Sequence, residues 1–369
     1  MVAVAYICYY TGLILVECLY DDDGSRARQS YRAIAEHCWG STWAGRLVLG
    51  AQMLELLMTC ILYVVICGDL LESSFSSATI NKMGWMLLCT ALLIPCAFIE
   101  NLVVVSKLSF WNTVSHVIIN LIVIAYCFTE VSSWSLSSIK FTFDIKIFPT
   151  VLGIIVFSYT SHIFLPTLEY GMKDRSQFKP MLMYSHLFAA LFKALFAIVG
   201  YLTFDDFTQE EVTNNLPSQS FKIVINIILV IKALLSYPLP YYAIVDLLTN
   251  EYFRGRPLSK FPVCFSPDGS LREWALAMRI CIVLFILFMA ISIPHFALLM
   301  GLVGNITGTM LSFIWPSIFH LQMKRHLLPK YKLWLDVSVI CIGAIFCLSG
   351  LFYSSMGLHR AIHYPNEYL

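Results

Sequence analysis

The chain has 369 residues, of which 59% are hydrophobic and only 13% are charged, and its mean hydropathy is +0.75. A water-soluble domain carries about 25% charged residues, so this composition excludes a soluble globular protein. The net charge of +1, with no Lys/Arg cluster interleaved with aromatic residues, gives no sign of nucleic-acid binding. Apolar runs of about 20 residues, long enough to cross a bilayer, recur throughout the chain. The sequence therefore predicts an all-α polytopic membrane protein.

Ten apolar windows are predicted to cross the membrane as helices, because a backbone exposed to lipid has to satisfy its own hydrogen bonds. They lie at about 1–20, 45–71, 83–100, 108–129, 148–168, 184–204, 221–248, 273–293, 295–320 and 333–354. Between the eighth and ninth windows, Pro294 and His295 leave room only for a tight turn. The twelve cysteines are scattered, most of them within these windows. We expect them to pack as small apolar side chains, without disulfides or a metal site.

The distribution of basic residues predicts the orientation in the membrane. The loops that follow odd-numbered windows contain fifteen Lys and Arg, whereas the even loops and the C-terminal tail contain four. The odd loops are therefore expected to be cytoplasmic. They include 21–44, 169–183, 249–272 and 321–332, whereas the acidic even loop 205–220 is expected to be luminal.

This orientation places the first residue on the non-cytoplasmic side. Residues 1–20 lack the basic start and small-residue cleavage site of a signal peptide. We therefore expect at least one further helix, and a cytoplasmic tail, to precede this sequence in the whole protein. On that view, 1–369 is a single transmembrane transporter domain that is N-terminally incomplete.

The fifth window is interrupted by consecutive polar residues. After Phe157 come Ser158, Tyr159, Thr160, Ser161 and His162. Five successive positions sweep about 400° around a helix, so no single buried face can accommodate them all. Either the helix is enclosed by protein on every side, with Ser and Thr bonded back to the preceding turn, or it unwinds. Broken helices of this kind bind substrate in secondary transporters, and Gly153 and Pro166 would ease a deformation here.

The seventh window contains a second interruption, SYPLPYY at 236–242. Pro238 and Pro240 each remove a backbone donor and clash with the preceding turn, which predicts a kink. Two interpretations of Ser236, Tyr237 and Tyr241 stay open. They line a substrate path, or they pack around the kink.

Ionisable residues inside membrane windows are functional candidates by default. Glu55 lies on one helix stripe together with Gln52, Thr59 and Tyr63. Lys193 and Lys232 lie near the centres of the sixth and seventh windows. Glu55 with either lysine could form a structural ion pair, or these residues could couple protons and gate the substrate path.

Two further ionisable residues are weaker candidates. His162 could titrate in the physiological range, although a histidine within a polar run more often serves as a hydrogen-bonding group. Glu17, at the cytoplasmic end of the first window, is expected to be solvated. The chain has no Ser/His/Asp, Walker or HExxH arrangement, so an enzyme is not expected.

Several stretches resemble one known family. They are FPTVLGIIVFSYTSHIFLPTLE (148–169), LELLMTCILYVV (54–65), LLIPCAFIENLVVVSKLS (92–109), VIKALLSYPLPYYA (230–243), PHFALLMGLVGNITG (294–308) and NNLP (214–217). The 148–169 stretch resembles the sixth helix of the vesicular branch of the amino acid/auxin permease family. The resemblance covers essentially the whole chain and is specific to this branch.

The resemblance implies a LeuT-like fold of eleven helices, built as inverted repeats, of which ten would be present and the first absent. It implies a proton-coupled antiporter that loads GABA and glycine into synaptic vesicles. It also places Phe157 to His162 and Tyr237 at the substrate and Glu55 at proton coupling. Half of the family's substrate cradle would lie on the absent helix.

Other functions stay open beside this one. The chain could be a broader neutral amino acid transporter of the lysosomal or plasma membrane, or a truncated fragment that does not transport. A channel is disfavoured, because it would need rings of charges or carbonyls around an axis. The expected partners are a small amino acid and the lipid bilayer, with no nucleic acid and no cofactor beyond a proton gradient. The sequence assigns no role to chloride and no oligomeric state.

Overall fold

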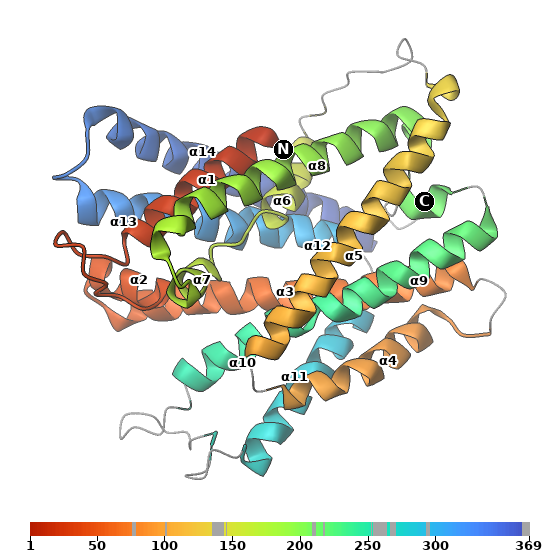
Figure 1. Ribbon diagram of the computed structural model, residues 1–369, viewed down its shortest axis with the longest axis horizontal. Coiled ribbons are helices and arrows are strands. Elements are labelled where there is room, and N and C mark those ends of the chain that lie inside the picture. The colour runs from red at the N-terminus through yellow and green to blue at the C-terminus, as the bar shows by residue number, and fades with distance from the viewer. Residues whose placement is uncertain are drawn as a thin grey trace. The chain divides into compact units, whose positions relative to one another are not determined.

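The computed structural model describes residues 1–75, 79–99, 102–134, 144, 146–208, 212–216, 218–251, 253, 264–265, 271–292 and 296–363. Within these residues seven helices are long and apolar enough to cross a membrane (Figure 1). Three shorter apolar helices, at Val2–Glu17, Lys82–Phe98 and Phe148–Phe157, lie in the other three predicted windows. The helical, polytopic class is therefore confirmed, whereas the LeuT-like arrangement and the count of ten spans stay predictions. The expected turn at Pro294 and His295 lies outside the described residues.

The chain divides into two compact units. Unit 1 comprises Met1–Glu55, Phe141–Leu195 and His295–Leu369. Unit 2 comprises Leu56–Lys140 and Phe196–Pro294. Two long helices, α3 (Thr42–Ser74) and α8 (Phe178–Phe204), contribute residues to both units.

Unit 1 is built from helices far apart in sequence. Besides parts of α3 and α8, it contains α1 (Val2–Glu17), α2 (Tyr31–Trp39), α6 (Phe148–Phe157), α7 (Leu165–Gly171), η3 (Arg175–Gln177), α12 (Phe296–Val303), the π-helical segments η6 (Gly304–Gly308) and η7 (Met310–Ile314), α13 (Trp315–Lys324) and α14 (Lys330–His363). Within it, α1 packs on α13, α13 packs on α14, and α6 packs on α12, η6 and α14.

Helix α6 approaches α12 and η6 backbone to backbone. A methyl group added at Gly153 would overlap the carbonyl oxygen of Gly301 and the side-chain amide of Asn305. One added at Gly304 would overlap the Gly153 carbonyl oxygen. Small residues permit this close approach between membrane helices. The Asn305 amide also donates to the Pro149 carbonyl at 2.9 Å, so the start of α6 is tied to η6.

A short amphipathic helix lies within the predicted loop 21–44. The Ser30 hydroxyl caps the start of α2 by accepting the Ala33 amide at 3.2 Å. The helix ends at Gly40, whose φ of 60° is a left-handed conformation that suits glycine. Tyr31 is buried and donates to the Leu311 carbonyl at 2.7 Å, which anchors α2 to η7.

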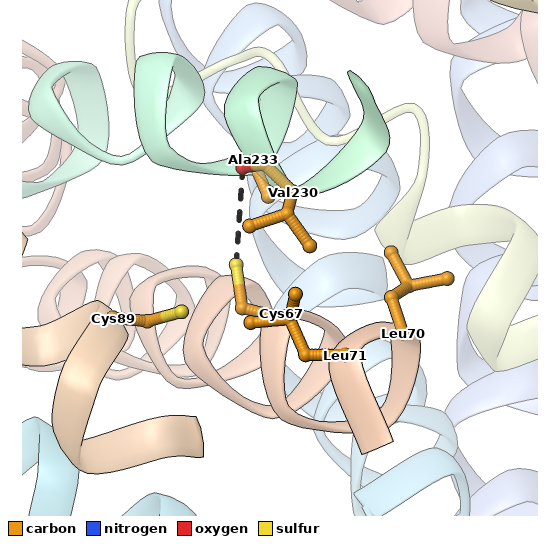
Figure 2. Close-up of a cluster of buried hydrophobic side chains, with 6 residues drawn as sticks. All are labelled: Cys67, Leu70, Leu71, Cys89, Val230 and Ala233. Carbon is orange, nitrogen blue, oxygen red and sulfur yellow. Dashed lines mark hydrogen bonds between the residues drawn. The ribbon is translucent and has the colours of Figure 1, made fainter. Parts of the chain in front are cut away.

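Unit 2 contains α4 (Lys82–Leu93), η1 (Ile94–Phe98), α5 (Leu102–Thr129), η2 (Val131–Ser133), η4 (Asp205–Phe207), η5 (Val212–Asn215), α9 (Gln219–Ser236), α10 (Pro238–Glu251) and α11 (Glu273–Ser292), with parts of α3 and α8. Its core includes the buried side chains of Cys67, Leu70, Leu71, Cys89, Val230 and Ala233 (Figure 2). The Cys67 thiol points at the Val230 carbonyl, 4.0 Å away. This cluster joins α3, α4 and α9.

The seventh predicted window is interrupted where the two prolines stand. Helix α9 ends at Ser236 and α10 begins at Pro238, with Tyr237 between them. The bend predicted at the two prolines stays a prediction, whereas the interruption of the helix there is confirmed. This interruption follows from the donors that Pro238 and Pro240 lack.

Candidate functional site

The fifth predicted window is broken in its middle. Helix α6 ends at Phe157 and α7 begins at Leu165, and the residues between them form turns and irregular backbone. Within the described part of the chain, the carbonyls of Tyr159 and Thr160 accept no backbone hydrogen bond. The break predicted at 157–162 is confirmed, and the alternative of a continuous helix is wrong. Unwound backbone at membrane depth is tolerated where it is buried in protein or lines a cavity.

Lys193 of α8 binds the first freed carbonyl of the break. Its ammonium group donates to the Ser158 carbonyl oxygen at 2.8 Å and to the Ser158 hydroxyl at 3.1 Å. The same group lies 3.9 Å from the centroid of the Tyr159 ring, a cation–π distance. A positive charge at the C-terminal end of α6 also interacts favourably with the negative end of the helix dipole. Lys193, a sequence candidate for gating, therefore lies at the break itself.

The Glu55 carboxyl group lies next to another residue of the break, Thr160. Glu55 is 3% exposed, and Thr307 of η6 donates a hydrogen bond to its Oε2. The Thr160 hydroxyl also interacts with this carboxyl group. The structure therefore brings together the predicted proton-coupling residue and the predicted substrate segment.

The π-helical segments complete this polar cluster. Ser312 of η7 donates to the Thr160 hydroxyl at 3.3 Å. A methyl group added at Gly308 would lie 3.3 Å from the Thr160 hydroxyl oxygen and 3.6 Å from Glu55 Oε1. Because Gly308 has no side chain, Thr160 and Glu55 can approach the η6 backbone. Segments of π-helix occur often at functional sites.

His162 faces α1 and not this cluster. It is fully buried, and its Nε2 lies 3.0 Å from the Thr11 hydroxyl. A methyl group at Gly12 would lie 3.8 Å from the same nitrogen. Ser161, next to it, is partly buried, and its buried hydroxyl has no hydrogen-bond partner among the described residues. His162 thus ties the break to α1, and the Ser161 hydroxyl is left for a ligand or water.

The second half of the broken helix is anchored by a buried carboxylate. Glu169 of α7 is 1% exposed and accepts a hydrogen bond from the Tyr20 hydroxyl. Arg26 Nε lies 3.4 Å from one Glu169 oxygen, and Arg175 Nε lies 3.5 Å from the other. Arg26 also donates to the Pro166 carbonyl at 2.9 Å. Both ends of α7 are therefore fixed to the segment that follows α1.

Two sequence candidates, Tyr237 and Lys232, belong to unit 2. Tyr237 is fully buried, and its ring stacks on Tyr241 with centroids 5.6 Å apart. Its hydroxyl has no hydrogen-bond partner among the described residues. Lys232 is half-buried, and its carbonyl accepts the Ser236 hydroxyl at 2.8 Å. The roles of Tyr237 and Lys232 in binding and gating stay predictions.

Sequence reasoning missed Thr307, Ser312 and Glu169. The sequence around Thr307 matches a glycosylation pattern, Asn305-Ile306-Thr307, placed inside an apolar window. A buried Asn or Thr within such a window indicates a polar contact, but not its partner, which lies 252 residues away for Thr307 and Glu55. Glu169 stands at the end of a window, where a carboxylate is expected to be solvated.

The broken helix, the buried carboxyl group beside it and the apolar helices are the features of a membrane transporter. The family described as "Transmembrane amino acid transporter protein" matches residues 1–356, and the chain belongs to this family. It is therefore a transporter and not an enzyme.

The chain is similar to vesicular transporters over nearly its whole length. It is 53% identical to the vesicular GABA transporter of Caenorhabditis elegans over 98% of this chain and 74% of the relative. It is 47% identical to the human vesicular inhibitory amino acid transporter over 97% and 69%. The amino acid transporter AVT1E of Arabidopsis thaliana is 24% identical over 92% and 63%. These relationships indicate a multi-pass amino acid transporter of a vesicle membrane.

Lys193→Met is expected to impair amino acid uptake. The change keeps the apolar stem and leaves the Ser158 carbonyl without its charged donor, which costs about 1.5–3 kcal/mol. Initial uptake into proteoliposomes should fall about tenfold or more. Lys173→Met, at an exposed lysine, is the matched control and should transport like the unmodified chain. Unchanged uptake by Lys193→Met would remove Lys193 from the site.

Proposed function

We propose that this chain exchanges luminal protons for cytosolic GABA or glycine across a synaptic vesicle membrane. The observation that carries this proposal is the position of Thr160, which belongs to the broken helix and interacts with the Glu55 carboxyl group. Carboxyl groups inside membrane proteins commonly belong to proton relays. The names of the vesicular GABA and inhibitory amino acid transporters, at 53% and 47% identity, support the choice of substrate.

The main-chain carbonyls of the break that accept no backbone hydrogen bond suit a small zwitterion. The free carbonyls of Tyr159 and Thr160 would accept hydrogen bonds from the substrate's ammonium group. The Ser161 hydroxyl and the Ser158–Lys193 pair would lie next to its carboxylate. A substrate bound at the break would contact Thr160 and thereby change the interaction of the Thr160 hydroxyl with the Glu55 carboxyl group.

Exchange follows from competition for Glu55. When the Glu55 carboxyl group holds a proton, it is neutral, and its hydrogen bonds with Thr307 and Thr160 satisfy it without a substrate. When the proton leaves, the carboxylate attracts the positive end of the substrate toward the break. Proton and ammonium group thus alternate at one place, which is the requirement for antiport.

Uptake of labelled GABA into acidified proteoliposomes tests this function. We expect accumulation that depends on the proton gradient and is reduced by excess unlabelled glycine. Amino acids with bulky side chains should compete weakly if the site selects a small zwitterion. Competition by a wide range of neutral amino acids would instead favour the broader transporter. A chain that shows neither accumulation nor counterflow would be a non-transporting one.

Glu55→Gln is expected to abolish proton-driven accumulation while counterflow at equal pH is partly retained. The amide keeps the shape and the hydrogen bond with Thr307 but cannot exchange a proton. The measurement compares uptake with and without a pH gradient, and Glu36→Gln, at a half-buried carboxylate paired with Arg32 on α2, is the control. Accumulation that survives in Glu55→Gln would place proton coupling elsewhere.

A further inference from the structure

A buried histidine lies between two carboxylates that come from two other helices of unit 1. His320 of α13 is 0% exposed, and its Nδ1 lies 2.7 Å from Asp336 Oδ2 of α14. Its Nε2 lies 3.4 Å from Glu17 Oε2 of α1. Tyr10 of α1 donates to the second oxygen of Asp336 at 2.5 Å. Helix α1 packs on α13, and α13 packs on α14 (Figure 1).

The cluster runs from the surface into the interior. The Glu17 side chain is 54% exposed, whereas the side chains of His320 and Asp336 are fully buried. Sequence reasoning expected Glu17 to be solvated, which its exposure confirms, but did not expect its buried neighbour. An imidazole ring can accept a proton at one nitrogen and release another from the second. His320 has a carboxylate at each nitrogen, which is the arrangement of a relay.

The charge balance of the cluster favours an additional proton. Two carboxylates and a neutral imidazole carry a net charge of −2, and each added proton brings the cluster one step closer to neutrality. Buried charges are costly unless they are balanced. Tyr10 donates a hydrogen bond to Asp336 without adding charge. The state that holds the extra proton is therefore the one that burial prefers.

Other charged and titratable groups act on the cluster from its edges. Lys179 of α8 and Lys332 of α14 act on Glu17, and Tyr6 of α1 acts on Tyr10. Asp22, which follows α1, pairs with Lys324 and His326.

Water can reach the same helix ends. A cavity of about 340 Å³ is lined by Tyr20–Asp22, which follow α1, and by Gln322–Lys324, at the end of α13, together with Arg28, His37 and Cys38. Glu17 precedes Tyr20 by three residues, and His320 precedes Gln322 by two. The distance of 3.4 Å between His320 and Glu17 is within ion-pair range but longer than a good hydrogen bond.

We infer that Glu17, His320 and Asp336 form a second proton-binding site of the transporter, distinct from Glu55. Glu17 takes a proton from water and passes it to His320 Nε2, while the proton on Nδ1 moves to Asp336. The return of the Asp336 proton by the reverse path, or rotation of the ring, resets the histidine. The site rests on the proposed function only in that transport would make use of the proton it holds.

The first test is the pH profile of GABA uptake by the full chain in liposomes, between about pH 5.5 and 8. Two proton sites predict a steep profile for the unmodified chain. Glu17→Gln should flatten it and lower uptake about tenfold at the favourable pH, with counterflow at equal pH retained. His320→Gln should do the same, and His326→Gln, at an exposed histidine, should leave the profile unchanged.

A merely structural tie between the helices predicts a different result. It would lower folded yield and counterflow together and leave the shape of the pH profile unchanged. If His320→Gln fails to fold, Glu17→Gln is the deciding variant. Its side chain is half-exposed, so the change removes the titratable carboxyl group without disturbing core packing. A folded Glu17→Gln with the unmodified profile would overturn the proposal.

A second readout does not depend on transport. Infrared difference spectra on acidification should show carbonyl bands of newly protonated carboxyl groups. One band should disappear in Asp336→Asn or Glu17→Gln, and another should disappear only in Glu55→Gln. Loss of neither band in the first two variants would contradict a proton site at His320. If the unmodified chain shows the bands but no proton-driven uptake, the proposed exchange fails and the second proton site stands.

Discussion

An unpaired backbone group inside a membrane has to find a partner, and this requirement governs unit 1. Where α6 ends at Phe157, the chain exposes carbonyls that a continuous helix would have used. Lys193 satisfies the carbonyl of Ser158. The side-chain hydroxyl of Thr160, within the break, interacts with Ser312 of η7 and with the buried Glu55 carboxyl group. The same deficit that makes the break costly makes it able to bind a small polar ligand.

The surroundings of the break are fixed on both of its sides. Upstream, Gly153 contacts Gly301 and Gly304 so closely that a methyl group added at Gly153 or Gly304 would overlap the facing backbone, which fixes the position of α6. Downstream, Glu169 and its arginines fix α7 to the segment after α1. The flanking half-helices are therefore positioned separately, and the turns between them can respond to a ligand. The cluster around His320 joins α1, α13 and α14 in the same unit, so proton binding there and at Glu55 would act on one framework.

Much of this arrangement can be predicted from the sequence, and the rest depends on contacts between distant residues. Five consecutive polar residues in an apolar window predict the break, and two prolines predict the kink at Tyr237, because both effects are local. The sequence identifies Glu55 as a functional candidate, because charged residues are rare inside membrane helices. Its partner Thr307, and the pairing of His320 with Asp336, could not be predicted. They require the packing of helices that no local pattern specifies. The sequence identifies Lys193 as a functional candidate, but it does not predict the contact of Lys193 with the Ser158 carbonyl.

Hydrogen exchange at residues 158–164 tests most directly whether the break binds substrate. Among the described residues, the amides of Ser161, His162 and Ile163 donate no backbone hydrogen bond, so in the absence of ligand they should exchange faster than those of α6. Saturating GABA should slow exchange in this segment and leave distant helices of the same unit unchanged. Amides that exchange as slowly as those of α6, and do not respond to GABA, would contradict the account.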